Sequence, residues 1–189
     1  MFIQTETTPN PATLKFIPGR PVLEGGTLEF STRESAGRSP LAQRLFDVSG
    51  VTGVFYGSDF ITVTKADGEW TQLKPAILSA IMEHYMSEAP LLAGNAGASD
   101  DEDEERDEFY DPSDRDTVYM IKELIETRVR PAVANHGGDI TFRGFKDGIV
   151  YLHMKAACSG CPSATETLKH GIQNLLQHFV PQVVEVRAA

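Results

Sequence analysis

The chain has 189 residues, 41% of them hydrophobic, so it can bury one sizeable core or two small ones and is neither fibrous nor wholly disordered. Its formal charge of −10 is concentrated in residues 100–116, where eleven acidic residues are offset only by Arg106 and Arg115. The rest of the chain is almost neutral, and no basic patch predicts nucleic acid as a partner.

The first residues show no basic segment followed by a long apolar one and no arginine-rich presequence. No run of about 18 apolar residues occurs, so no membrane partner is expected. The chain has only two cysteines and no visible export signal, which together predict a cytoplasmic protein. In a reducing cytoplasm, a close pair of cysteines is more often a metal-binding or redox pair than a structural disulfide.

The first domain is predicted to be α/β and to comprise residues 1–87. Apolar and β-branched runs predict strands at residues 2–5, 13–16 and 27–30, and residues 51–56 and 60–65 predict a hairpin. Ser39 followed by Pro40 is typical of a helix start, and residues 73–87 predict a longer helix. This part has no cysteine, and its single histidine, His84, is interpreted as a packing or surface residue.

Residues 88–114 are predicted to be a flexible, acidic, disordered linker. They begin with small residues, continue into an acidic block that repels itself, and lose the apolar periodicity of the domains on either side.

The second domain, residues 115–189, is predicted to have the order helix, strand, strand, helix, strand. Pro131 should kink the first helix or mark its last turn, and residues 139–145 and 149–154 predict a hairpin closed by Asp147 and Gly148. A second helix follows Pro162, and residues 183–186 predict a last strand. This order needs only a three-stranded sheet with two helices on one face, so the fold class is α+β in two small domains.

The only two cysteines, Cys158 and Cys161, stand in a C-x-x-C pattern between a predicted strand and a predicted helix. A disulfide between them would close a ring too short to restrict the unfolded chain much, so a chemical role is favoured. The positive end of the helix favours thiolate over thiol. Thiolate both binds metal and attacks disulfides, so ligation and redox exchange both fit.

The number of ligands limits the possible metal sites. Iron–sulfur clusters and closed zinc sites usually take four protein ligands, and this chain has two cysteines. The histidines of the second domain are not interpreted as ligands: His136, His153, His170 and His178. If the pair holds a cluster, a two-fold dimer is the simplest source of four thiolates, and a cluster at such a shared, shallow site would be transferable.

Several motifs resemble the NifU-type C-terminal domain of the Nfu iron–sulfur cluster carriers. They are residues 130–133 (RPAV), 137–140 (GGDI), 157–163 (ACSGCPS), 167–169 (TLK) and 171–172 (GI). Residues 8–11 (TPNP) and 14–16 (LKF) are similar to the Nfu N-terminal domain. The resemblance covers nearly the whole chain except the linker. Ala156 is a mild departure, because the family often has glycine at this place.

The resemblance implies a [4Fe-4S] cluster bridged between two protomers through Cys158 and Cys161 of each. It implies a non-enzymatic carrier that is a homodimer when loaded, receives its cluster from an upstream scaffold or donor, and delivers it to apo recipient proteins. The longer NifU scaffolds have an additional assembly domain with extra cysteines, which are absent here, so a carrier is favoured over a primary assembly scaffold.

Two alternatives use the same cysteines. A thiol–disulfide oxidoreductase would also have its cysteine pair at the start of a helix. The sequence after the helix, however, lacks the pair of strands and the proline that are typical of thioredoxin-like proteins. A structural dimer bridged by zinc would use the same cysteine thiolates as ligands. The first domain shows no chemistry of its own and is predicted to tune partner choice or to shield the cluster site.

Overall fold

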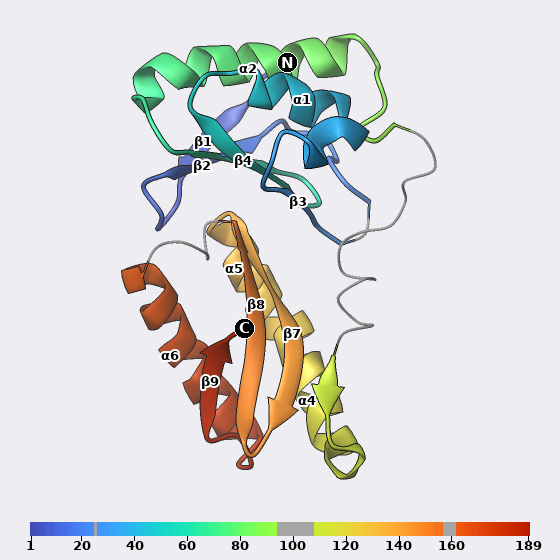
Figure 1. Cartoon of the computed structure of the whole chain (residues 1–189), viewed down its shortest axis with the longest axis vertical. Coiled ribbons are helices and arrows are strands. Elements are labelled where there is room, and N and C mark those ends of the chain that lie inside the picture. Colours follow the sequence, from blue (N-terminus) through green and yellow to red (C-terminus); the bar gives the residue numbers. More distant parts are fainter. Residues whose placement is uncertain (25, 94–107, 157–161) are drawn as a thin grey trace. The chain divides into compact units, whose positions relative to one another are not determined.

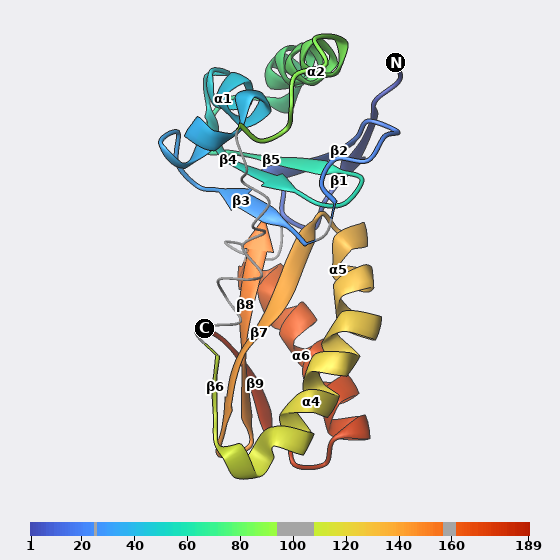
Figure 2. The same cartoon turned by 90° about the vertical axis from the view of Figure 1, so that its right-hand side faces the viewer.

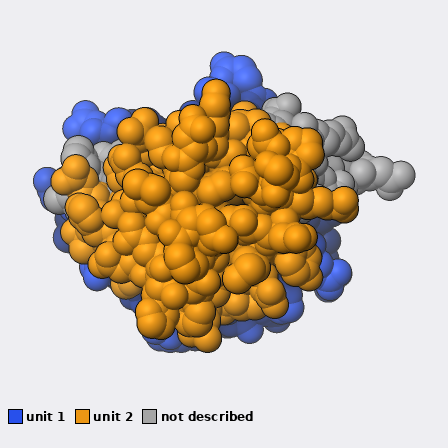
Figure 3. Space-filling model, turned by 90° about the horizontal axis from the view of Figure 1, so that it is seen from below, with its two compact units in different colours: residues 1–100 blue, residues 101–189 orange. Residues whose placement is uncertain are grey.

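The computed structural model describes residues 1–24, 26–93, 108–156 and 162–189. The chain divides into two compact units, Met1–Asp100 (unit 1) and Asp101–Ala189 (unit 2), which are coloured separately in Figure 3. Each unit combines a sheet with helices and has its own hydrophobic core. The predicted α+β class is confirmed.

Unit 1 contains a five-stranded antiparallel sheet of order β1-β2-β5-β4-β3. Its strands are β1 (Gln4–Thr7), β2 (Thr13–Ile17), β3 (Leu28–Phe30), β4 (Val51–Tyr56) and β5 (Ile61–Lys65). Strands β4 and β5 form the predicted hairpin. The helices of this unit, α1 (Pro40–Phe46) and α2 (Trp70–Met86), lie on one face of the sheet, and a short 3-10 turn, η1 (Ser35–Arg38), precedes α1 (Figure 2).

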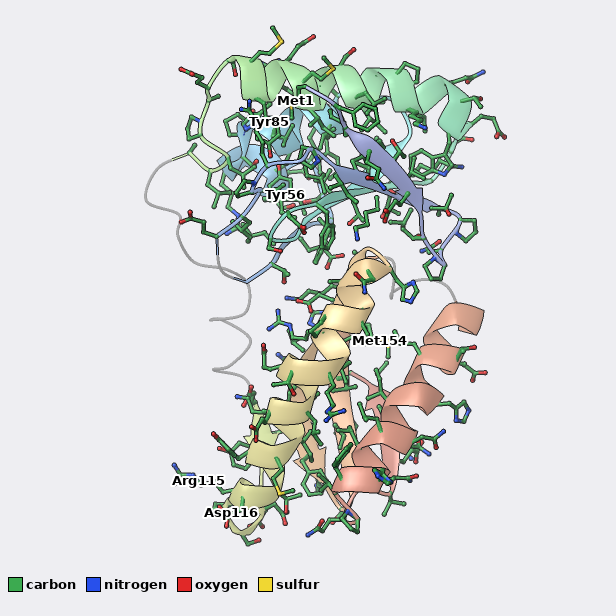
Figure 4. The ribbon with its side chains drawn as sticks, turned by 180° about the vertical axis from the view of Figure 1, so that it is seen from behind. Met1, Tyr56, Tyr85, Arg115, Asp116 and Met154 are labelled. Carbon is green, nitrogen blue, oxygen red and sulfur yellow. The ribbon has the colours of Figure 1, made fainter. Side chains whose placement is uncertain are left out.

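Helix α1 begins as the sequence predicts. Ser39 accepts a hydrogen bond from the Ala42 backbone N–H at 3.3 Å, and Pro40 occupies the first turn, where its missing N–H costs nothing. The same hydroxyl lies 2.8 Å from the hydroxyl of Tyr56. The Tyr56 side chain is buried in the core of unit 1 (Figure 4). Burial raises the pKa of Tyr56, so this phenol stays protonated. One serine thus caps a helix and satisfies a buried phenol.

His84 was predicted to be either a packing or a surface residue, and the structure shows that it is a packing residue. It is 3% exposed on α2, and its Nδ1 has no hydrogen-bond partner within the part of the chain that the structure describes. Burial lowers its pKa because a charged imidazolium would lose its contact with water, and the positive charge of the neighbouring Arg44 lowers it further. His84 is therefore held neutral in the core of unit 1.

Unit 2 contains a four-stranded sheet of order β6-β7-β8-β9. Its strands are β6 (Phe109–Tyr110), β7 (Gly138–Lys146), β8 (Ile149–Ala156) and β9 (Glu185–Ala188). Its helical segments are η2 (Pro112–Asp114), α4 (Arg115–Leu124), η3 (Ile125–Val129), α5 (Arg130–Asn135) and α6 (Pro162–Phe179). The long helices lie on one face of the sheet, and the core between them includes Met154 (Figures 2 and 4).

The sheet of unit 2 has four strands instead of the predicted three. The additional strand, β6, pairs in parallel with Gly144 and Phe145 of β7. The Phe109 ring lies over Gly144, where a Cβ would come within 2.4 Å of it, and Glu108 forms an ion pair of 2.9 Å with Lys122. A two-residue strand has no periodicity to reveal it, so the sequence pattern missed it. The predicted linker, residues 88–114, includes β6, and its residues 94–107 lie outside the described residues.

The first helix of unit 2 changes geometry along its length. Residues of α4 are α-helical, those of η3 are π-helical, and α5 resumes the α-helix with Pro131 in its first turn. Proline has no N–H to donate and crowds the preceding turn, which is where the wider π-helical turn occurs. The irregularity predicted at Pro131 is thus a π-helical segment just before it.

The β7–β8 hairpin is confirmed, with both turn residues, Asp147 and Gly148, in the left-handed region (φ 52° and 79°). Strand β9 pairs in parallel with β8. No helix among the described residues is long and apolar enough to cross a membrane.

Candidate functional site

The predicted ligands, Cys158 and Cys161, lie outside the described residues. The structure describes the two elements that flank them: β8, which ends at Ala156, and α6, which begins at Pro162 (Figure 1). The predicted position of the pair between a strand and a helix therefore agrees with the elements on both sides.

Ala156 has an unusual backbone conformation. Its φ is 55°, in the left-handed region that L-residues with a Cβ rarely adopt, and its side chain is buried. Glycine reaches this region without steric cost, which explains why glycine suits this position. The last residue before the cysteine segment is thus held in a conformation that costs energy, as is common beside functional sites.

The turn between α5 and β7 lies next to Ala156, because β7 begins opposite the end of β8. Helix α5 ends in a tight exit, where the N–H groups of His136 and Gly137 donate to the carbonyls of Val133 and Ala134 at 2.9 and 3.0 Å. Gly137, with φ 78°, directs the chain into β7. The next residue, Gly138, is the partner of Ala156 in the β7–β8 pairing. The helix exit and the strand end therefore meet on adjacent strands.

A buried ion pair joins α5 to the start of β7. Arg130 Nε and Nη2 donate to the two carboxylate oxygens of Asp139 at 2.9 and 2.6 Å. The Asp139 side chain is 4% exposed and that of Arg130 18%. Arg130 Nη1 also donates to Glu126 at 2.6 Å, and Asp139 accepts from the Ile140 N–H at 2.8 Å. This two-point geometry is the strong form of an arginine–carboxylate pair.

Sequence reasoning missed the ion pair between Arg130 and Asp139 and the burial of Lys155. Asp139 and Lys155 are partners in the β7–β8 pairing, and both are buried. The available signal was a set of charged residues within strands that are otherwise apolar. That signal does not say which charges meet, because the partner of Asp139 comes from the preceding helix.

Within residues 1–24, 26–93, 108–156 and 162–189, no three His, Cys, Asp or Glu residues come close enough to hold a metal ion. The described part of the chain therefore offers no preformed metal site that is independent of the cysteine pair.

Comparison with known proteins covers both units. Residues 3–88 match the family model for the N-terminal domain of Nfu/NifU scaffold proteins, and residues 121–187 match the NifU-like domain. A human protein named NFU1 iron-sulfur cluster scaffold homolog, mitochondrial, is 50% identical over 97% of this chain and 70% of its own length. NifU-like protein 4, mitochondrial, of Arabidopsis thaliana is 50% identical over 97% of this chain and 64% of its own.

The chain is also similar to solved structures. The solution NMR structure of a NifU-like protein from Saccharomyces cerevisiae is 26% identical, covers 50% of this chain and 87% of that one, and has a TM-score of 0.45.

The chain belongs to the Nfu/NifU scaffold protein family. It spans 64% to 70% of the length of the two relatives described above. The resemblance found in the sequence motifs is confirmed.

The predicted cytoplasmic location is wrong by this comparison, because both relatives are named as mitochondrial. The prediction rested on the small number of cysteines and on the absence of a visible signal. Such an absence could not carry it, since targeting segments are read by receptors and removed, and take no part in the fold.

Proposed function

We propose that this protein is an iron–sulfur cluster carrier. Two copies hold one [4Fe-4S] cluster through Cys158 and Cys161 of each and pass it to apo recipient proteins. The observation that carries the proposal is the C-x-x-C pair between β8 and α6 in a chain of the Nfu/NifU scaffold family. The cluster is cargo, so the chain needs no catalytic residue of its own.

The flanking elements support the binding of soft metal centres. The start of α6, an 18-residue helix, carries the positive end of the helix dipole, which stabilises thiolate sulfur close to it. Pro162 is the first residue of α6, so the helix begins directly after Cys161. The pair therefore adjoins the helix end that favours the ligating form of cysteine.

The ligand count supports a shared site. A [4Fe-4S] cluster takes four thiolates, and one chain has two cysteines. The described residues contain no group of three or more His, Cys, Asp or Glu side chains that could hold a metal ion by themselves. A second copy supplies the same two sulfurs by symmetry, which closes the coordination without another kind of partner.

The test is anaerobic reconstitution of the full chain, with iron, sulfide and molecular mass measured in one sample. We expect about four irons for every two chains and a dimer mass. Cys158→Ser and Cys161→Ser should each abolish binding. Ser159→Ala keeps both thiols and serves as the matched control within the same segment.

Two outcomes would contradict the proposal. A monomer that holds a full cluster would exclude the shared site, and unchanged iron binding in either cysteine variant would exclude the pair as ligands. Metal analysis after aerobic purification separates cluster from zinc, because zinc survives oxygen. Insulin reduction by the apo chain, at a rate typical of a redox enzyme, would favour the oxidoreductase.

For unit 1 we propose a role in choosing recipients or in shielding the cluster. Its core is complete without unit 2, and among its described residues no group of metal-binding side chains occurs. Its contribution therefore concerns the transfer of the cluster and not the coordination of iron.

A further inference from the structure

We propose that Arg130 and Asp139 are positioning residues for the cysteine segment, and that their ion pair sets how long the cluster stays bound. This inference rests on the proposed function. Neither residue needs to touch the cluster, because the effect passes through the backbone of the β7–β8 hairpin.

The ion pair fixes the start of β7 against α5. Both carboxylate oxygens of Asp139 accept from Arg130, so the pair resists rotation as well as separation. Arg130 is in turn held by Glu126 on the preceding turn. The π-helical segment η3 ends at Val129, directly before Arg130, and changes the direction in which the residues after it project.

Strand pairing carries this constraint to the cysteine segment. Asp139 is the partner of Lys155 and Gly138 that of Ala156, so the residue fixed by Arg130 lies beside the last two residues of β8. Ala156 then adopts its left-handed conformation, which requires the surrounding structure to hold it there. If the start of β7 loosens, Ala156 can relax, and the backbone entering the cysteine segment changes direction.

Burial makes the pair sensitive to substitution. Replacing Arg130 removes two charged donors from a carboxylate whose side chain is 4% exposed, so the local structure must rearrange or admit solvent. The ion pair between Arg187 and Glu185 on β9 offers a contrast, since its side chains are 50% and 42% exposed. It provides a control pair of an arginine and a carboxylate in the same unit.

The experiment measures loss of cluster to excess chelator from the reconstituted full chain, followed by visible circular dichroism. We expect Arg130→Gln and Asp139→Asn each to shorten the cluster lifetime on the order of ten-fold, the effect typical of groups that orient metal ligands. Arg130→Lys keeps the charge but not the two-point geometry, and should fall between. The double variant should lose its cluster no faster than the Arg130→Gln variant, because each single variant already removes the Arg130–Asp139 pair.

Two controls separate positioning from loss of stability. Arg187→Gln removes an exposed pair, and Val186→Ala weakens the core of unit 2 at β9. Both should keep the lifetime of the unaltered chain at a temperature where every variant is folded by far-ultraviolet circular dichroism. Equal lifetimes in all variants would overturn the proposal, as would an equal loss in Val186→Ala.

A second readout needs no cluster. In the apo chain, alkylation rates of Cys158 and Cys161 by iodoacetamide should change in Arg130→Gln and Asp139→Asn and not in Arg187→Gln. If the unaltered chain binds no iron, the proposed function fails, and the alkylation rates alone decide the positioning role. Unchanged rates would then overturn it.

Discussion

The two units are built from similar parts, but their irregular features lie in different places. In unit 1 the sheet is entirely antiparallel, and the unusual polar groups, Tyr56 and His84, are enclosed in the core. In unit 2 a buried ion pair and a left-handed alanine lie where the start of β7 pairs with the end of β8, next to the cysteine segment, and a π-helical segment directly precedes Arg130. The buried polar groups of unit 1 therefore affect the stability of that unit, whereas the buried ion pair of unit 2 lies close to the proposed cluster site.

The largest expected effect comes from separating the units. Residues 101–189 alone should hold as much iron as the full chain, and residues 1–100 should hold none, because each unit has its own core and the cysteines lie in unit 2. Transfer from the isolated unit 2 to at least one recipient should be slower. Iron analysis and a transfer assay test this. Unchanged transfer to every recipient tried would remove the proposed role of unit 1.

Core substitutions should affect the units one at a time. Phe30→Ala in unit 1 and Leu152→Ala in unit 2 each remove a fully buried side chain. They should lower the free energy of unfolding of their own unit by about 3–5 and about 2–5 kcal/mol, respectively. Urea denaturation monitored by hydrogen exchange shows in which unit the stability is lost. Iron content should fall only with Leu152→Ala. A loss of iron with Phe30→Ala would mean that the units are not independent.

Acid should weaken unit 1 through His84. The pKa of His84 in the folded chain is lowered by burial and by Arg44, so the unfolded chain binds the proton first. Stability is therefore complete above the unfolded pKa of about 6.5 and is lost as the pH falls below it, at no more than about 1.4 kcal/mol per pH unit. His84→Phe should flatten this dependence in urea titrations. The same slope in the variant would show that other groups cause it.

The smallest effect is expected from Ala156→Gly. Glycine removes the steric cost of the left-handed backbone but gains flexibility when unfolded, so the net change should be a stabilisation of less than about 1 kcal/mol. Asp147→Gly is the matched control, since Asp147 has φ 52° at the opposite end of the same hairpin. Thermal unfolding should respond slightly to both. Only Ala156→Gly should alter the visible circular dichroism of the bound cluster.

Local patterns predicted most of the elements. The cap at Ser39, the hairpins β4–β5 and β7–β8, and the helix after Pro162 all follow from short-range chemistry. These features depend on residues within a few positions of each other, such as a hydroxyl that reaches a nearby N–H. The position of the cysteine pair between a strand and a helix followed from the same kind of evidence.

The sequence by itself determined the α+β class, the family and the candidate ligands Cys158 and Cys161. Tertiary structure decided the parallel pairing of β6, the burial of His84, the left-handed φ of Ala156 and the meeting of Arg130 with Asp139. The physical reason is that apolar periodicity says which face of an element is buried but not which element covers it. Pairings between elements depend on the faces that meet when the chain packs.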